Sequence, residues 1–383
     1  MRLNWKSWGM VAVSVLALSG VVGFAMGAPS SEDGPTKYKY DPNWPKELPN
    51  KWTMEGVTGM FVDQDDHVWV LNRPRDITPR EALAATNPPV AECCVQSPAV
   101  YEFDVDGNLL RAWGKPNEVP GWPGSEHTIF VDREHNVWIG GARPGDSLLK
   151  FTQDGKFISD WGHRGPKVDP KDQKEDNQQT DLLLRGVAAA ALDEDAHEIY
   201  IADGYLNKRV MVYDLDNGKF KRGWGAYGKP LSEISNDGPQ PDHNPNGPPA
   251  KDFRSPVHCV RLSKDGLVYV CDRGGDRVQV FTKQGKFVQE FFVANNTLRN
   301  GSVGSIDFSP DPQQKYVYIA DIMNNVVWQV ERKSGKTVGK IGHSGHQGGF
   351  FTYLHVAWMD SKGNLYTGEV DSGKRVQKFL PVN

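Results

Sequence analysis

Short apolar segments separated by polar turns follow one another along the chain in an order that repeats six times. Each repeat has an apolar strand, a turn, a second apolar strand that contains a tyrosine or tryptophan, a loop, and a third strand. The second strands are residues 68–71, 137–140, 199–202, 268–271, 317–320 and 365–368. Short β-branched and aromatic runs between Asp/Gly turns are typical of strands, and no long amphipathic helical pattern competes with them. The pattern therefore predicts an all-β chain.

The third strands lie at equivalent places in the repeats, at residues 99–103, 148–151, 209–213, 277–281, 326–330 and 375–379. Six units of one four-stranded antiparallel sheet each make a six-bladed β-propeller. The last unit stops after its third strand, so we expect the segment around Tyr38 and Tyr40 to supply the missing outer strand. We place the propeller at residues 53–383 and a linker or closing strand at residues 28–52.

The N-terminus has the pattern of a targeting segment. Arg2 and Lys6 precede an apolar, uncharged stretch at residues 10–26, and Ala25-Met-Gly27 before Ala28 is an acceptable small-x-small cleavage site. We therefore expect a signal peptide at residues 1–27 and a periplasmic or secreted protein. An uncleaved membrane anchor is the alternative, because the apolar run is near the lower limit for spanning a bilayer.

Composition narrows the classes of partner. The chain has 383 residues and a formal net charge of -4, which argues against a basic nucleic-acid-binding surface. We expect no nucleic-acid partner, contact with a membrane only through an uncleaved N-terminus, and a monomer that binds a small molecule or a peptide. Four cysteines permit disulfides in an oxidising compartment: Cys93 and Cys94 are adjacent, and Cys259 and Cys271 face each other across a hairpin. Either pair can also stay reduced.

One position in the first strands alternates between histidine and a small residue. Aligned on the residue that opens the first turn, the positions five residues upstream are Thr58, His127, Ala188, His258, Gly304 and His355. Alternate blades of a six-bladed ring lie about 120° apart, and first strands line the central channel. Three imidazoles at one height can therefore meet on the axis, and the small residues between them leave room.

Three neutral imidazoles with an open fourth position are the ligand set of a catalytic zinc, whereas a structural zinc takes four protein ligands. Other divalent metals of borderline character also accept imidazole. The histidines His67, His135 and His197 are also in register. They lie in the first turns of three consecutive blades on the opposite face, so they cannot converge, and we interpret them as solvated turn residues.

The rim that carries the axial histidines also carries the ends of the second strands, because antiparallel strands place the start of one at the end of the other. Arg73, Tyr205 and Arg273 lie there. Arginines bind carboxylates through two parallel hydrogen bonds, and a tyrosine beside a metal and cations can act as a base. For the two arginines an ordinary surface salt bridge is the alternative.

Three aspartates at the same strand ends, Asp203, Asp272 and Asp321, are expected to cap the loops to the third strands. The long insertions at residues 74–98, 163–181 and 228–252 open on this same face. Long loops on one face of a rigid ring form a binding site or a lid in many proteins.

The repeats resemble NHL repeats, and the group of residues on the rim resembles the site of peptidyl-α-hydroxyglycine α-amidating lyase. The motifs EHTIFVD at 126–132, PVH at 256–258 and YLH at 353–355 stand where that family has its zinc histidines. ADGYLNKRV at 202–210 is similar to the motif that carries its catalytic tyrosine, and LNR at 71–73 and CDR at 271–273 are similar to its two substrate-binding arginines.

The resemblance implies a six-bladed propeller with zinc held by His127, His258 and His355. It implies that Tyr205 takes the hydroxyl proton of a carbinolamide whose terminal carboxylate Arg73 and Arg273 hold. The C–N bond would then break to leave an amide and glyoxylate. The family's calcium-binding aspartate after the third histidine is Val356 in this chain, so the resemblance gives no support for calcium.

Two other departures are Leu206, where the family has a cysteine of its disulfide pattern, and Tyr353, where the family presents a methionine to the substrate. A different class of function is the alternative: a non-catalytic exported NHL propeller that binds a peptide, glycan or protein partner on its loop face, because many NHL-type propellers are scaffolds and a fold does not determine a function. A hydrolase or lactonase of the propeller type is disfavoured, because the aligned axial positions carry no Asp or Glu.

Overall fold

The structure is a computed structural model that describes residues 34–142, 148–161, 174–181, 184–238, 240–241 and 243–382. The expected signal peptide at residues 1–27 lies outside the described residues. By its internal contacts the chain divides into Met1–Gly34 and Pro35–Asn383, and the second unit contains the fold.

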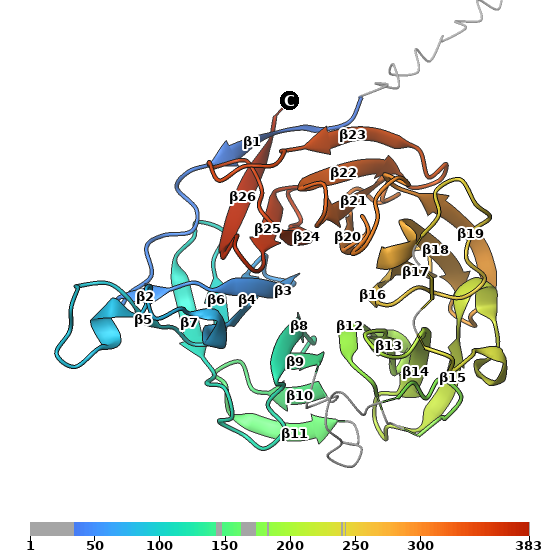
Figure 1. Ribbon diagram of the computed structural model, residues 1–383, viewed down its shortest axis with the longest axis horizontal. Helices are drawn as coiled ribbons and strands as arrows, with labels where there is room; N and C mark the ends of the chain where they lie inside the picture. The colour runs from blue at the N-terminus through green and yellow to red at the C-terminus, as the bar shows by residue number, and fades with distance from the viewer. Residues whose placement is uncertain are drawn as a thin grey trace, which may run out of the picture. The chain divides into compact units, whose positions relative to one another are not determined.

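Six four-stranded antiparallel sheets stand around a central axis, as Figure 1 shows. Blade 1 consists of β3 (Gly56–Val62), β4 (Val68–Arg73), β6 (Val100–Phe103) and β7 (Leu109–Trp113). Blade 2 consists of β8 (Ser125–Val131), β9 (Val137–Ala142), β10 (Leu148–Phe151) and β11 (Phe157–Trp161). Blade 3 consists of β12 (Val187–Asp193), β13 (Glu198–Asp203), β14 (Arg209–Asp214) and β15 (Phe220–Trp224). Blade 4 consists of β16 (Val257–Leu262), β17 (Leu267–Asp272), β18 (Arg277–Thr282) and β19 (Phe287–Phe292). Blade 5 consists of β20 (Ser305–Phe308), β21 (Tyr316–Asp321), β22 (Val326–Glu331) and β23 (Thr337–Ile341). Blade 6 consists of β24 (Leu354–Met359), β25 (Leu365–Glu369), β26 (Arg375–Val382) and β1 (Lys37–Asp41).

The prediction of an all-β, six-bladed propeller with four-stranded blades is confirmed. The helices in the described part of the chain are short 3₁₀ turns, namely η1 (Pro74–Asp76), η2 (Leu83–Ala85), η4 (Glu194–Ala196), η5 (Ala226–Gly228), η6 (Leu231–Glu233) and η7 (Arg273–Gly275). No helix in that part has the length and apolar composition that crossing a bilayer requires.

The two ends of the propeller meet in blade 6. Strand β1 pairs antiparallel with β26, with Tyr38 opposite Pro381 and Tyr40 opposite Phe379, so the segment around Tyr38 and Tyr40 occupies the expected outer position. The Tyr38 hydroxyl donates to the Tyr318 hydroxyl of blade 5 at 3.0 Å. The N-terminal strand therefore joins the last blade to its neighbour, and the ring is closed by hydrogen bonds.

The packing of the aromatic residue in the second strand explains why the repeats have a tyrosine or tryptophan at this position. Trp69, Trp138 and Tyr366 are at most 3% exposed, so their rings pack between blades. Their polar ends reach the aspartate that opens the first turn of the same blade: Trp69 Nε1 donates to Asp63 Oδ2 at 2.8 Å, and the equivalent bonds in blades 2 and 6 are 3.0 and 3.1 Å. Each such residue buries a large apolar surface and still satisfies its polar atom.

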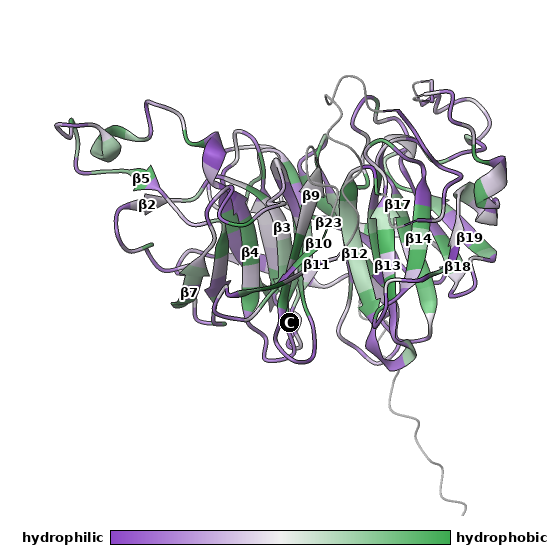
Figure 2. Ribbon diagram, turned by 90° about the horizontal axis from the view of Figure 1, so that it is seen from below, coloured by the Kyte–Doolittle hydropathy of each residue, from purple (hydrophilic) through white to green (hydrophobic). Residues whose placement is uncertain are grey.

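The long connections lie on the face that carries the starts of the first strands. Figure 2 shows the ring edge-on, with hydrophobic residues concentrated in the strands and the short strands β2 (Trp52–Thr53) and β5 (Val95–Gln96) projecting beside blade 1. These two strands pair in parallel and fasten the insertion at residues 74–98. Most of the insertion at residues 163–181 lies outside the described residues. Cys93 pairs with Cys94 and Cys259 with Cys271.

Truncating the fully buried aromatic residue of blade 1 tests this packing. We expect Trp69→Ala to lower the free energy of unfolding by about 3–5 kcal/mol, because it removes the buried ring and the hydrogen bond to Asp63 Oδ2. Urea unfolding followed by circular dichroism measures the change. Val288→Ala is the control, since Val288 is 47% exposed on β19, and its effect should stay within about 0.5 kcal/mol. Equal effects of the two substitutions would contradict the account.

Candidate metal centre

The three axial histidines stand at β-bulges in the first strands of alternate blades. In β8 the pairing with β9 passes from Glu126 to Thr128 and skips His127. The pairings of β16 and β24 skip His258 and His355 in the same way. A bulged residue is left out of the ladder and its side chain is re-aimed, so each imidazole turns from the plane of its blade toward the axis.

The imidazoles converge with close to threefold symmetry. All three pairs of ring centroids are 4.9 Å apart, with interplanar angles of 78–85°. One nitrogen from each ring lies within 4.8 Å of the other two, and the residues are 3–4% exposed. The structure therefore brings His127, His258 and His355 together, as the alternating register predicted, and the cluster can hold a metal.

Backbone carbonyls of small residues in the intervening blades accept hydrogen bonds from the imidazoles. His127 Nδ1 donates to the Ala188 carbonyl oxygen at 2.7 Å, and His258 Nδ1 donates to the Gly304 carbonyl oxygen at 2.5 Å. A carbonyl can only accept, so Nδ1 carries the proton in these two rings and Nε2 presents a lone pair to the axis. For His355, the backbone of Thr58 favours a proton on the ring, although Nδ1 lacks a partner in good hydrogen-bonding geometry.

All three rings are held in the neutral form that a metal requires. Burial, together with the Arg73 and Arg273 guanidiniums, lowers the pKa of His127 to about 3. Burial likewise lowers the pKa values of His258 and His355 well below the ordinary value, with Arg273 contributing at both and Arg73 at His355. Neutral imidazoles whose lone pairs point at one another are poised to bind a cation.

Tyr205 reaches this centre from the loop between β13 and β14. Its hydroxyl lies 2.6 Å from His127 Nε2 and 3.1 Å from His258 Nε2. One phenolic proton cannot satisfy the acceptors of three imidazoles. The donor set therefore fits a divalent metal that binds the three Nε2 atoms, with the tyrosine hydroxyl beside the open side of the site.

Close backbone packing sets the position of the tyrosine loop. A Cβ at Gly204 would lie 2.0 Å from the Val257 carbonyl oxygen, so only glycine fits there. A Cβ at Gly186, where φ is +92°, would lie 2.6 Å from Cβ of Tyr205. Ser255 Oγ donates to the Tyr205 carbonyl oxygen at 3.0 Å and is 3.2 Å from that of Gly204. The backbone that carries Tyr205 thus has little freedom to shift.

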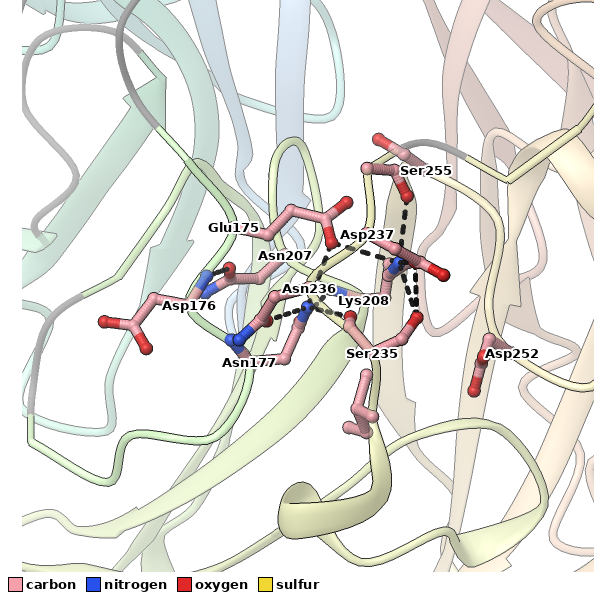
Figure 3. Close-up of polar contacts among 12 residues, drawn as sticks. Glu175, Asp176, Asn177, Asn207, Lys208, Ser235, Asn236, Asp237, Asp252 and Ser255 are labelled. Atoms are coloured by element: carbon pink, nitrogen blue, oxygen red, sulfur yellow. Dashed lines mark hydrogen bonds and ion pairs between the residues drawn. The ribbon is translucent and has the colours of Figure 1, made fainter.

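A buried polar cluster holds the other end of the same loop (Figure 3). Asn207 Oδ1 accepts from the Asp176 backbone N–H at 2.8 Å, and the Lys208 backbone N–H donates to Asn177 Oδ1 at 2.6 Å. The fully buried Lys208 ammonium lies 3.0 Å from Glu175 Oε2. The connection into blade 3 therefore clamps the tyrosine loop, a contact between distant residues that no repeat pattern predicts.

Two guanidiniums act on the same site. Arg73 lies at the end of β4, and its Nε donates to the Glu126 carbonyl oxygen at 3.1 Å. Arg273 begins η7, is 8% exposed, and its buried Nε has no acceptor. Among the described residues neither guanidinium lies within salt-bridge distance of a carboxylate, whereas the neighbouring Arg75 pairs with Glu126 at 3.3 Å. The salt-bridge alternative is thus not observed, and both cations are available to an anion.

The capping role expected of the aspartates is observed for Asp203 and Asp321, which accept from Asn207 Nδ2 and the Asn324 backbone N–H of the loops to their third strands, at 2.7 and 2.9 Å. Asp272 instead accepts from the Arg254 backbone N–H before β16 and from Arg277 Nε on β18, at 2.8 and 2.7 Å. These carboxylates therefore hold loops and are not directed at the centre.

The histidines of the opposite face do not converge, in agreement with the interpretation of their register. His67 is nevertheless more than a solvated turn residue, because its Nδ1 lies 2.8 Å from the buried Glu102 carboxylate. His135 and His197 lie near Asp65 and Asp216, at 3.7 and 3.0 Å. Each of these contacts joins a turn to another element: His67 to β6, His135 to the first turn of blade 1, and His197 to the turn between β14 and β15.

Comparison with known proteins supports the resemblance seen in the motifs. The chain is 28% identical over 297 residues to human NHL repeat-containing protein 3, covering 75% of this chain and 74% of that protein. It is 32% identical over 176 residues to peptidyl-glycine alpha-amidating monooxygenase B of Xenopus laevis, covering 43% of this chain and 16% of that protein. The chain is a six-bladed propeller that is similar to NHL repeat-containing proteins and, over less than half of its length, to the amidating monooxygenase.

No family model matches the chain. Among solved structures, a streptogramin B lyase aligns with 91% of this chain and 98% of its own, at 10% identity and a TM-score of 0.48. A likeness this low carries no argument about the site.

Removing one axial ligand tests the centre. We expect wild-type protein to retain an axial equivalent of divalent metal through dialysis, and His258→Ala to lose that equivalent, because two imidazoles hold a metal far more weakly than three. Inductively coupled plasma mass spectrometry measures the metal per chain. His197→Ala, whose imidazole is 64% exposed on the opposite face, should keep the wild-type content. Unchanged metal in His258→Ala would contradict the assignment.

Proposed function

We propose that this protein is an exported, metal-dependent carbon–nitrogen lyase of the peptidyl-α-hydroxyglycine amidating type. Its substrate is a carbinolamide that ends in a carboxylate, and its products are an amide and glyoxylate. The observation that carries the proposal is the meeting of three inward-facing imidazoles, the Tyr205 hydroxyl and two guanidiniums without carboxylate partners. Zinc is the expected metal, and another divalent metal of borderline character fits the same ligands.

The two arginines suit the carboxylate end of such a substrate. Guanidiniums bind carboxylates through paired N–H donors, and a buried arginine without an anion is an incomplete arrangement that a substrate carboxylate completes. Arg73 and Arg273 come from blades 1 and 4 and both act electrostatically on the axial imidazoles. They therefore orient the carboxylate so that the neighbouring carbinol carbon lies toward the centre.

Tyr205 suits the carbinol hydroxyl. When bound, zinc would supply Lewis acidity that stabilises negative charge on the carbinol oxygen. Tyr205, acting as a phenolate, takes the hydroxyl proton, and the O–H electron pair becomes part of the new C=O bond. The C–N bond breaks, its electron pair passes to the amide nitrogen, and that nitrogen takes up the proton held by Tyr205. No water is consumed, so the reaction is an elimination and not a hydrolysis.

Export is part of the proposal. The positive residues, apolar stretch and cleavage pattern of residues 1–27 support a signal peptide. The pairing of all four cysteines into two disulfides is in keeping with an oxidising compartment. We accordingly place the protein in the periplasm or outside the cell.

A non-catalytic propeller that binds a peptide, glycan or protein on its loop face is the second candidate. The human relative is named for its repeats and not for a reaction, which is compatible with this alternative. The two candidates differ in their dependence on the centre, because a scaffold should bind its ligand equally well after His127→Ala, whereas the lyase should lose activity.

The direct test is release of glyoxylate from an α-hydroxyglycine-extended peptide, measured together with the amide product. We expect the metal-loaded protein to form the two products in equal amounts. Tyr205→Phe should lower kcat by about 10²–10⁴-fold, because it removes the group that accepts the hydroxyl proton. Tyr40→Phe on β1 is the matched control. Metal-loaded protein without turnover would leave the centre in place and reject the lyase assignment.

Loss of one arginine should affect binding of the substrate carboxylate. We expect Arg273→Gln to raise KM by about 10- to 100-fold, the effect of losing hydrogen bonds to a charged group worth roughly 1.5–3 kcal/mol. Steady-state kinetics on the same peptide measure it. Arg133→Gln, on an exposed side chain that pairs with Asp195, serves as control. An unchanged KM with a peptide acid, or an equal rise with a peptide that lacks the carboxylate, would contradict the role.

A further inference from the structure

A second set of cation ligands converges where the connection at residues 228–252 meets the segment between blades 4 and 5. His243 Nε2 lies 3.0 Å from the backbone oxygen of Asn295 and 3.0 Å from its side-chain Oδ1. The same nitrogen lies 3.8 Å from Oδ2 of Asp276. None of these residues belongs to the axial centre or to its rim of arginines and tyrosine.

Hydrogen bonds within this group cannot satisfy it. The orientation of the Asn295 amide is set by its Nδ2, which donates to the Pro245 carbonyl oxygen at 3.3 Å, so Oδ1 faces the imidazole. Three oxygen acceptors therefore surround one nitrogen, and an imidazole nitrogen supplies at most one proton. At least two of the three oxygens are left without a donor from His243.

The carboxylate of Asp276 has the strongest need for a partner. The residue is 0% exposed, and its Oδ2 is buried without a hydrogen bond. Its Oδ1 accepts from the Ser302 backbone N–H at 2.8 Å. Among the described residues His243, 9% exposed in its side chain, is the sole basic group within salt-bridge distance. Burial raises the pKa of Asp276 to about 7 despite the bond from Ser302, which reflects the cost of a buried carboxylate without a full counter-charge.

We propose that His243, Asn295 and Asp276 bind a second divalent cation through Nε2, the two oxygens of Asn295 and Asp276 Oδ2. Ligands about 2.0–2.2 Å from a metal are roughly 3.0–3.6 Å from one another, so donor separations of 3.0 and 3.8 Å are close to those of a coordination shell. One imidazole with oxygen donors favours zinc or manganese over calcium and magnesium, which take oxygen ligands.

The cation would fasten the 228–252 connection to the ring. Asp276 precedes β18, and Asn295 precedes blade 5, while His243 is the ligand from the connection. The same connection supplies Ser235 and Asp237, whose side chains lie 3.5 Å from the Lys208 ammonium (Figure 3). A metal at His243 would therefore hold the segment that also packs on the tyrosine loop.

The experiment counts bound zinc in protein stripped of metal, equilibrated with Zn²⁺ alone and dialysed. We expect two equivalents in wild type and one in each of His243→Ala, Asp276→Asn and His258→Ala. His346→Ala, on an exposed loop, should keep two. Asp276→Asn preserves the acceptor for Ser302 N–H, so a folded variant is available if His243→Ala folds poorly, and circular dichroism identifies such failure.

The combined variants make the result decisive. Adding His243→Ala to His258→Ala should leave no tightly bound zinc, because each substitution removes a different equivalent. Two results would overturn the second site. In the first, the wild-type protein binds one equivalent of zinc and the His243→Ala variant also binds one. In the second, the His258→Ala variant binds no zinc. These counts do not depend on turnover, so failure of the lyase proposal and failure of this site are distinguished.

Discussion

The hydrogen bonds that the axial imidazoles donate outward decide what the centre of the ring can hold. His127 and His258 donate from Nδ1 to backbone carbonyls of the blades between them, so their Nε2 lone pairs face the axis. Burial and the guanidiniums of Arg73 and Arg273 keep the rings neutral. Protonating an imidazole is therefore costly. A bound cation can satisfy the converging nitrogen lone pairs at lower cost.

The alternation of histidine and small residues at the axial position of successive blades follows from this constraint. Blades 2, 4 and 6 each contribute a bulged histidine, while the blades between them contribute a carbonyl beside a small side chain. A Cβ at Gly304 would lie 3.0 Å from the Ala320 carbonyl oxygen and 3.2 Å from that of His355. On the rim, the residue before the third strand of blades 3, 4 and 6 makes a polar contact whose chemistry differs from blade to blade. Lys208 pairs with Glu175, Asp276 accepts from Ser302, and Lys374 pairs with the buried Glu55. Each such contact binds a long connection to the ring.

The fold and the axial cluster could be predicted from the sequence because both obey the repeat. The spacing of the strands is periodic, and the register of His127, His258 and His355 survives in every alternate unit. The bulges that aim the imidazoles could not be predicted, since they appear as skipped pairs and have no residue signature. Contacts such as that of Asn177 with Lys208, or His243 with Asn295, join insertions that belong to no repeat. A sequence period carries no information about such pairs, and only the folded chain brings them together.

The central claim is that one divalent metal binds the three inward nitrogens on the axis. Anomalous diffraction at the absorption edge of zinc, from crystals of protein loaded with zinc, tests it most directly. We predict a peak on the axis about 2.0–2.1 Å from Nε2 of His127, His258 and His355, with Nδ1 of the first two rings still bonded to the backbone. A zinc-loaded crystal without a peak there, or with the rings turned so that Nδ1 faces the axis, would contradict the account.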